Sequence, residues 1–291
     1  MTMRAEAIVV ALAVVLAAWL WPASARAHHV PGHGSSEGVR SINSLGNRGG
    51  KVSTRLLLLE EFSWQPSALT PGLRNELSLL GEYAPVPAFS FGAQLPFTVI
   101  DELGSPPSVG YGDTRAFLRV TPHADKLIHR TLTFNLAASF PTRTVRATVD
   151  PGRVWSVTPS AIFTRTYTGW YWQAIGLASL ETRPAGLAVD VSVGGQAGGK
   201  FANNKIALGG GVIVDVRAAN FCANPDGTRT YCNDNRAGED QREPGSVRAT
   251  ALASGSWTIQ PRWALIFGVQ VPFTPKRDLD LGLTFGVQTM F

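Results

Sequence analysis

The last thirteen residues of the chain, 279–291, alternate between apolar and polar side chains. One parity carries Leu279, Leu281, Leu283, Phe285, Val287 and Phe291, and only Thr289 interrupts it. The other parity carries Asp280, Gly282, Thr284, Gly286, Gln288 and Met290. Because successive side chains of a strand point to opposite faces, this period of two predicts a terminal β-strand with an apolar face and a polar face.

The same alternation recurs from Lys51 to the C-terminus and predicts a protein that is mostly sheet. Most of the predicted segments have the length of about 9–11 residues that a tilted strand needs to cross a bilayer. The alternation is blurred in 154–167 and 170–181, so ten or fourteen strands remain open beside our count of twelve. The predicted strands are 51–64, 73–83, 88–97, 111–121, 130–140, 154–167, 170–181, 186–195, 205–217, 246–259, 263–273 and 279–291.

Alternation by itself fits a soluble β-sandwich as well as a membrane barrel, because both have one apolar face. Three features favour the barrel. A closed sheet of twelve strands is too wide for side chains to fill with an apolar core. Aromatic residues such as Trp64, Trp155 and Trp257 gather near strand ends, where a membrane meets water. Long connections (98–110, 141–153, 218–245) alternate with short ones (168–169, 260–262), as in outer-membrane barrels.

We therefore predict an all-β, transmembrane, antiparallel up-and-down β-barrel over 51–291, with its polar face toward the lumen. Lipid offers no hydrogen-bond partners, so the last strand should pair with the first. Glu60 interrupts the apolar face of the first strand, and we expect it near the outer rim, where a charge costs little.

The N-terminus predicts export. Arg4 precedes an apolar run over 7–20, and Ala25-Arg26-Ala27 forms a small-x-small cleavage site. Residues 1–27 are therefore predicted to be a signal peptide. A membrane anchor is the alternative, but the apolar run is short for a span. Residues 28–50 are rich in Gly, Ser and His and are predicted to be a periplasmic arm or a partial plug of the lumen.

The polar faces of the predicted strands carry charges of both signs. Such residues either line an aqueous path and set its selectivity, or pair with one another and brace the wall, and the pattern does not decide between these roles. The candidate lumen residues are Arg74, Glu76, Glu82, Asp113, Arg115, Arg119, Asp190, Asp215, Arg217 and Arg248.

Cys222 and Cys232 are the only cysteines and lie in a polar segment. Exported chains pass an oxidising compartment, so we predict a disulfide between them. A metal site at these cysteines is disfavoured, because no histidine is near in sequence and the C-x-x-C spacing is absent.

Candidate chemistry is otherwise sparse. His28, His29 and His33 could bind copper or zinc, but a flexible tail that contains histidines is the favoured interpretation, so no metal or cofactor is predicted. No histidine lies within a predicted strand body, where a Ser–His dyad on the wall would need it, so we predict that the protein is not an enzyme. The net charge of +5 is mild and scattered, which does not favour nucleic acid as a partner.

Several segments together resemble the outer-membrane barrels of the MetA-pathway of phenol degradation family, which are compared with FadL-like transporters. The resemblance covers most of the mature chain. Its pieces are the His/Gly-rich start with Ser41-Ile-Asn-Ser44, the hairpin 76–97 with Leu95-Pro96-Phe97, Gly110-Tyr-Gly-Asp113 with Arg115 to Arg119, Phe140-Pro-Thr142, and 269–272 before the terminal strand.

The resemblance implies an outer-membrane channel or transporter for passive passage of small solutes, among them aromatic or apolar compounds. The alternative is a structural or interaction barrel, a plugged sheath or docking partner without transport. The implied partners are outer-membrane lipid, the outer-membrane assembly machinery and a small-molecule solute, and the oligomeric state stays open. The end of the chain is similar to the terminal signature of bacterial outer-membrane barrels, so Phe285, Val287 and Phe291 are expected to form the assembly signal.

Overall fold

The computed structural model describes residues 52–64, 72–102, 106–125, 130–145, 155–183, 186–223, 229–231, 244–274 and 281–291. The predicted signal peptide and the arm 28–50 lie outside these residues. Within the described ranges, no helix is long and apolar enough to span a bilayer. The described residues form fourteen strands: β1 (Arg55–Trp64), β2 (Gly72–Val86), β3 (Phe89–Glu102), β4 (Ser108–Tyr111), β5 (Thr114–Asp125), β6 (Arg130–Phe140), β7 (Trp155–Thr166), β8 (Trp170–Arg183), β9 (Gly186–Phe201), β10 (Ile206–Ala223), β11 (Arg229–Tyr231), β12 (Val247–Gln260), β13 (Trp263–Pro272) and β14 (Leu281–Met290).

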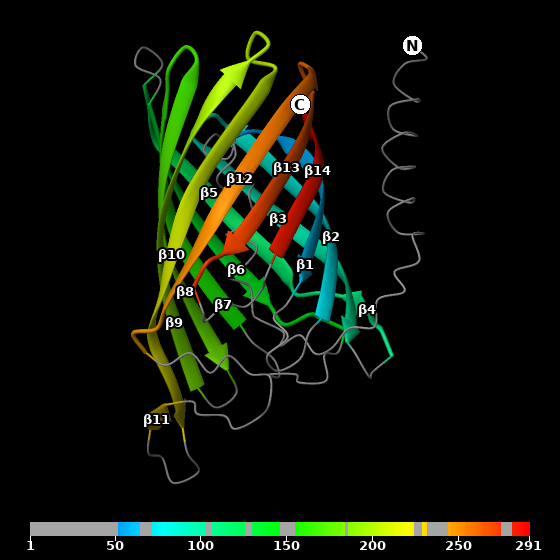
Figure 1. Ribbon diagram of the computed structural model, residues 1–291, viewed down its shortest axis with the longest axis vertical. Helices are drawn as coiled ribbons and strands as arrows, with labels where there is room; N and C mark the ends of the chain where they lie inside the picture. Colours follow the sequence, from blue (N-terminus) through cyan, green and yellow to red (C-terminus); the bar gives the residue numbers. More distant parts are fainter. Residues whose placement is uncertain are drawn as a thin grey trace.

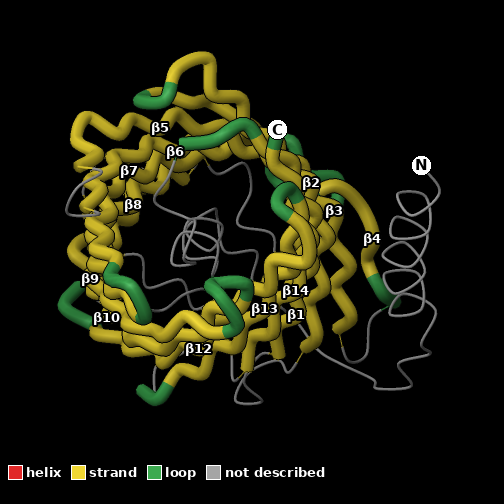
Figure 2. Tube along the Cα trace, turned by 90° about the horizontal axis from the view of Figure 1, so that it is seen from above, coloured by secondary structure: helices red, strands yellow, loops and turns green. Residues whose placement is uncertain are grey.

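Twelve of these strands close into a single antiparallel barrel in which each strand pairs with the next one along the chain (Figures 1 and 2). Closure is made by β14 and β1, whose register runs from Arg55 opposite Met290 to Trp64 opposite Leu281. The short strands β4 and β11 lie outside the closed path, where they pair with β3 and β10. The predicted fold class, a closed antiparallel barrel of twelve strands, is confirmed.

Each of the twelve predicted segments corresponds to one barrel strand, including the two with blurred alternation, which are β7 and β8. The predictions were wrong where strands continue past the apolar pattern. The predicted loop 98–110 contains the end of β3 and most of β4, and the predicted loop 218–245 contains the end of β10 and all of β11. These extensions have backbone partners of their own. Val109 and Tyr111 of β4 even continue the exposed apolar face, but β4 is only four residues long and is a weak signal in the sequence.

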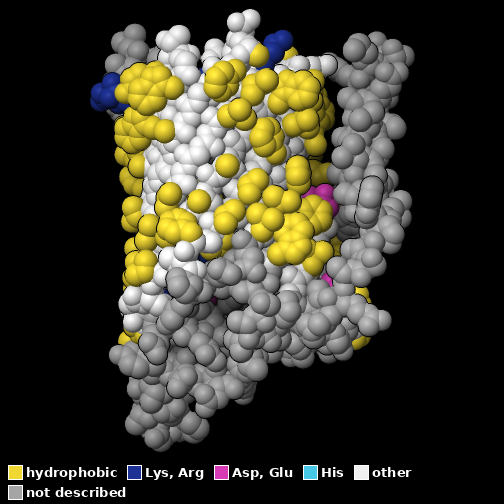
Figure 3. All heavy atoms as spheres, viewed as in Figure 1, with side chains coloured by type: hydrophobic (Ala, Val, Ile, Leu, Met, Phe, Trp, Pro, Cys, Tyr) yellow, Lys and Arg dark blue, Asp and Glu magenta, His cyan; other side chains and the backbone are white. Residues whose placement is uncertain are grey.

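The wall of the barrel has its apolar face outside and its polar face inside. On β3, Phe91 and Leu95 expose 44% and 54% of their surface, whereas Gln94 and Thr98 on the opposite parity expose 6% and 1%. In Figure 3, apolar side chains are spread over the outer face, among the backbone and other side chains drawn in white. A soluble protein would bury the apolar face, so this inverted arrangement is the one that suits a barrel surrounded by lipid.

The two ends of the barrel differ. One end, here the turn end, carries the tight connections 87–88, 167–169, 202–205 and 261–262, together with the C-terminus, and lies at the top of Figure 1. The other end, here the loop end, carries longer connections such as the one between β6 and β7. The exception is the short connection between Arg183 of β8 and Gly186 of β9.

β1 departs from the simple pattern because both of its faces are apolar. Leu57 and Leu59 point inward and are buried, and a side chain at Gly286 of β14 would lie too close to Leu59 Cδ1 and to the carbonyl oxygen of Leu58. Glu60 points outward in the middle of β1, opposite Leu77 and Phe285, and accepts a hydrogen bond of 3.3 Å from Asn75. Its expected place near the rim is therefore wrong, and a neighbouring amide partly offsets the cost of its position.

Candidate lumen site

Nine of the ten candidate lumen residues lie on the inner face of a barrel strand, and all nine are largely shielded from solvent. The tenth, Asp113, lies between β4 and β5. The nine form groups in which a carboxylate on one strand meets an arginine on a strand nearby. These groups lie at two levels, one toward the turn end and one toward the loop end.

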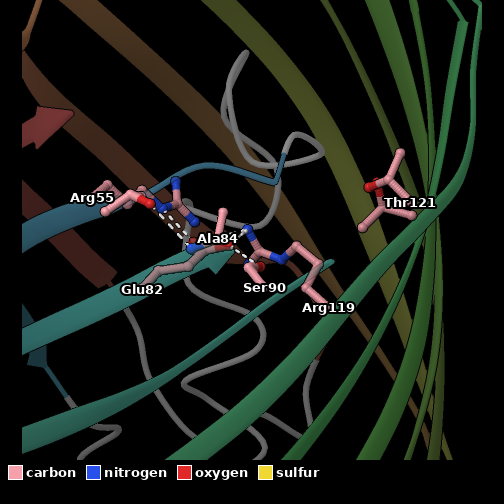
Figure 4. Close-up of polar contacts among 8 residues, drawn as sticks. Arg55, Glu82, Ala84, Ser90, Arg119 and Thr121 are labelled. Atoms are coloured by element: carbon pink, nitrogen blue, oxygen red, sulfur yellow. Dashed lines mark hydrogen bonds and ion pairs between the residues drawn. The ribbon is translucent and has the colours of Figure 1, made fainter. Parts of the chain in front are cut away.

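Glu82 on β2 is the centre of the group toward the turn end (Figure 4). Its Oε2 lies 2.6 Å from Arg55 Nε and 3.2 Å from Arg119 Nη1, and its Oε1 accepts a hydrogen bond of 2.5 Å from Ser90. Arg119 also stacks over the ring of Phe117, at 5.5 Å from the ring centre. One carboxylate thus joins β1, β2, β3 and β5, and every oxygen of it has a partner.

Glu76 is the centre of a second group, six residues nearer the loop end on β2. Its Oε2 accepts a hydrogen bond of 2.5 Å from Arg74, and its Oε1 accepts one of 3.2 Å from Ser78. Arg115 of β5 is more distant, with Nη1 at 3.6 Å from Oε1. Gln94 of β3 continues the group by donating to Ser78 at 2.9 Å.

Two further pairs lie on the opposite part of the wall. Asp215 of β10 accepts hydrogen bonds from Ser192 of β9 and, at 3.2 Å, from Arg248 of β12. Asp190 of β9 lies 2.8 Å from Arg217 Nε on β10. These contacts join three consecutive strands of the wall.

A cavity lies between the Glu76 group and the Asp215 group, inside the barrel toward the loop end. It is open to solvent, and the space that its lining surrounds, open solvent included, is about 780 Å³. Both charge groups therefore face the same space, although β2 and β10 are distant in the strand order. Its lining comprises Glu61, Phe62, Ser63, Arg74, Glu76, Arg115, Ile213, Asp215, Arg248, Thr250, Leu252, Gln270 and Pro272.

The cavity also touches an apolar patch on the inner wall, which the sequence analysis missed. Ile213 and Leu252 belong to a cluster of buried side chains with Ile162, Ile175 and Leu177. Ile213, Leu252, Ile175 and Leu177 lie on the same face of their strands as Asp215, Arg248 and Gln173, which point inward. The alternation along these strands could therefore have revealed that they face the lumen. Arg55 and Glu61 were missed for a related reason, because β1 carries leucines on both faces.

Asp113 lies in the connection between β4 and β5, where its Oδ1 accepts a hydrogen bond of 3.1 Å from the backbone N–H of Arg143. The predicted strand 111–121 breaks at residues 112–113, so Asp113 lies in a connection at the loop end and not on a barrel strand. Burial raises the pKa of its carboxyl, and the charge and backbone N–H of Arg143 only partly oppose that shift.

The other sequence predictions fall largely outside the described residues. The backbone of Cys222 belongs to β10, but Cys232 is not described, so the disulfide stays a prediction. His28, His29 and His33 also lie outside. In the part of the chain that the structure describes, no group of three or more His, Cys, Asp or Glu side chains could hold a metal ion.

Comparison of the fold with solved structures finds outer-membrane proteins. The COG4313 outer membrane channel from Pseudomonas putida F1 aligns with a TM-score of 0.60 and 15% identity, over 82% of this chain and 96% of that chain. The β domain of the Bordetella autotransporter BrkA aligns with a TM-score of 0.52 and 10% identity, over 82% of this chain and 99% of that one. No protein-family model and no curated protein matches the sequence.

At these identities the likeness concerns the fold. This chain shares the architecture of outer-membrane β-barrels over nearly the whole length of both structures. The residues of the cavity must therefore be interpreted from their own chemistry.

Proposed function

We propose that the protein is a channel of the bacterial outer membrane that allows passive passage of small solutes. The observation that carries this proposal is the cavity lined by charged and polar side chains inside a closed barrel whose outer face is apolar. An apolar exterior suits lipid, and a polar interior can hold water and polar solutes. The proposal needs no cofactor and no catalytic residue.

We further propose that residues 1–27 are removed on export, and that the assembly machinery recognises the end of β14. Phe285 and Phe291 support the second point, because they expose 51% and 77% of their surface on the outer side of the barrel. Val287 lies on the same parity between them. Aromatic side chains at a strand end also suit the interface between membrane and water.

The proposed solutes are small and include aromatic or apolar compounds, as in the MetA-pathway of phenol degradation family and the FadL-like transporters that the sequence resembles. The inward apolar cluster around Ile213 and Leu252 supports this class, because a path for inorganic ions alone has no use for an apolar wall.

Conductance across a planar lipid bilayer tests the proposal. The purified mature protein should produce discrete current steps whose size rises with salt concentration. Persistent absence of steps, both from the mature protein and from a variant lacking residues 28–50, would overturn the channel proposal.

A structural or interaction barrel is the alternative, and the ion pairs between strands favour it. Arg55–Glu82, Arg119–Glu82, Arg217–Asp190 and Arg248–Asp215 each connect two strands of the wall, as bracing requires. This alternative predicts a stable barrel that conducts no current in either form.

A further inference from the structure

We infer that the cavity toward the loop end binds small amphipathic monocarboxylates, with the carboxylate held by Arg115 and the apolar body against Ile213 and Leu252. This inference rests on the proposed channel function and specifies its solute. It follows from three observations: the unfilled donors of Arg115, the charge balance of the cavity, and the apolar part of its wall.

Arg115 is a buried arginine, and two of its three guanidinium nitrogens have no hydrogen-bond acceptor within the described part of the chain. Its Nε and Nη1 atoms are shielded from solvent and have no hydrogen-bond acceptor there. The carboxylate of Glu76 lies 3.6 Å from Arg115 Nη1 and already accepts hydrogen bonds from Arg74 and Ser78. A buried donor without an acceptor is costly, and a guanidinium presents adjacent N–H groups that match both oxygens of a carboxylate.

The charge balance favours a ligand with a single negative charge. Glu76 pairs with two arginines, Arg74 at 2.5 Å and Arg115 at 3.6 Å, and across the cavity Asp215 pairs with Arg248 at 3.2 Å. Of these three arginines, Arg115 lies farthest from the carboxylate that it pairs with. Over the whole lining, three arginines face Glu61, Glu76 and Asp215, so the cavity is formally neutral and offers no general attraction to polyanions.

The apolar wall indicates what the rest of the ligand should be. Ile213 and Leu252 expose only 3% and 6% of their surface, and both line the cavity together with Pro272. They lie on the paired strands β10 and β12, next to the residues of the Asp215 group. A compact ring or branched alkyl group would exchange its hydration for contact with this patch, while its carboxylate reaches the other wall.

Benzoate combines one carboxylate with a compact apolar ring, and acetate offers the same carboxylate almost without an apolar body. Comparison of benzoate with acetate therefore tests the apolar contact separately from the contact with the carboxylate.

The test measures the block of chloride current by benzoate and by acetate in planar bilayers with the mature protein. Benzoate should halve the current at a concentration at least about tenfold below that of acetate, because the apolar contact distinguishes them. Arg115→Gln should weaken the block by benzoate about tenfold or more, since a hydrogen-bonded charge pair is lost. Leu252→Thr should bring benzoate close to acetate and leave the acetate block unchanged.

Two matched controls accompany these variants. Arg165→Gln removes an arginine from the outer face near the turn end, where it stacks on Tyr167. Ile162→Thr changes a member of the same apolar cluster that does not line the cavity. Both controls should retain the tenfold preference for benzoate. Heat-modifiable migration on gels checks that each variant is folded.

Calorimetric titration of benzoate into the protein in detergent separates the failure of this inference from the failure of the channel. If benzoate binds and Arg115→Gln weakens that binding, the site is supported even when no current flows. The absence of current would then reject only the channel. Channels that benzoate and acetate block equally, or binding that Arg115→Gln leaves unchanged, would overturn the inference and leave the channel intact.

Discussion

Arg119 Nη1 lies 3.3 Å and 3.2 Å from the two carboxylate oxygens of Glu82, and this contact joins β5 to β2 although β3 runs between them. The same carboxylate holds Arg55 of β1. Glu82 is therefore the single negative charge between two buried arginines, and we propose that it braces the wall.

Glu82→Gln should destabilise the barrel by about 2 kcal/mol or more, because both arginines would keep buried charges without a counter-charge. Ser90→Ala is the matched control: it removes one hydrogen bond from the same carboxylate and no charge, and should cost about 1 kcal/mol. Urea unfolding of the protein in lipid vesicles, followed by tryptophan fluorescence, measures both values. Equal losses would contradict the bracing role.

Arg115→Glu should shift ion selectivity toward cations while the barrel stays folded. Arg115 lines the cavity and makes only a distant ion pair, so reversal of its charge acts on permeating ions more than on the wall. Reversal potentials in a salt gradient measure the change. Arg119→Glu provides the contrast, because Arg119 contacts both carboxylate oxygens of Glu82 at 3.3 and 3.2 Å, and the loss of these closer contacts should impair folding more. An unchanged reversal potential in Arg115→Glu would assign this residue to bracing as well.

The double variant Glu60→Leu, Asn75→Leu should be more stable than the natural chain by about 1 kcal/mol, because it removes a polar pair from the middle of the lipid-facing wall. Glu60→Leu alone should gain less, since it leaves the Asn75 amide without its acceptor. Unfolding in lipid vesicles compares the three proteins. Glu61→Leu on the inner face is the control and should give no gain; a loss of stability in the double variant would indicate a partner for Glu60 outside the barrel.

Asp113 should make the loop end more stable at low pH than at neutral pH. Its folded pKa is raised by burial, so its protonated form is favoured in the folded protein. This contribution is fully present below the ordinary pKa of an aspartate and is lost as pH rises through the raised value. Asp113→Asn should therefore reduce the pH dependence of thermal unfolding between acidic and neutral pH. Identical pH profiles for the two proteins would contradict the assignment.

Deletion of Phe291 should lower the amount of folded barrel in the outer membrane without a comparable loss of stability once folded. The residue follows β14, and its backbone N–H donates to Thr54 at 3.1 Å, so it adds little to the wall itself. Heat-modifiable migration of membrane fractions measures assembly, and urea unfolding of refolded protein measures stability. Parallel losses in both would assign a structural role to Phe291.

The sequence predicted the strands well because a lipid-facing wall imposes alternation over the whole length of each strand. β6 and β14 show this directly. β1 was harder, since Leu57 and Leu59 place apolar residues inward as well. The cavity could not be predicted: tilt and stagger decide which inward residues lie at the same height, and a single sequence does not specify that stagger. Arg115 and Leu252 meet the same space only because the sheet curves through a full turn.

The pairing of β1 with β14 also constrains how the molecule can form. β1 pairs with β2 and with β14, and its pairing with β14 can form only when the last strand is present. Ten consecutive residues of β1 stay unpaired on that side until then. Contacts between such distant parts of a chain make folding slow and leave unpaired backbone exposed in the meantime. A chain that lacks its last dozen residues would therefore form an open sheet with two unpaired edges. Such edges can pair with other chains, so we expect the truncated protein to aggregate.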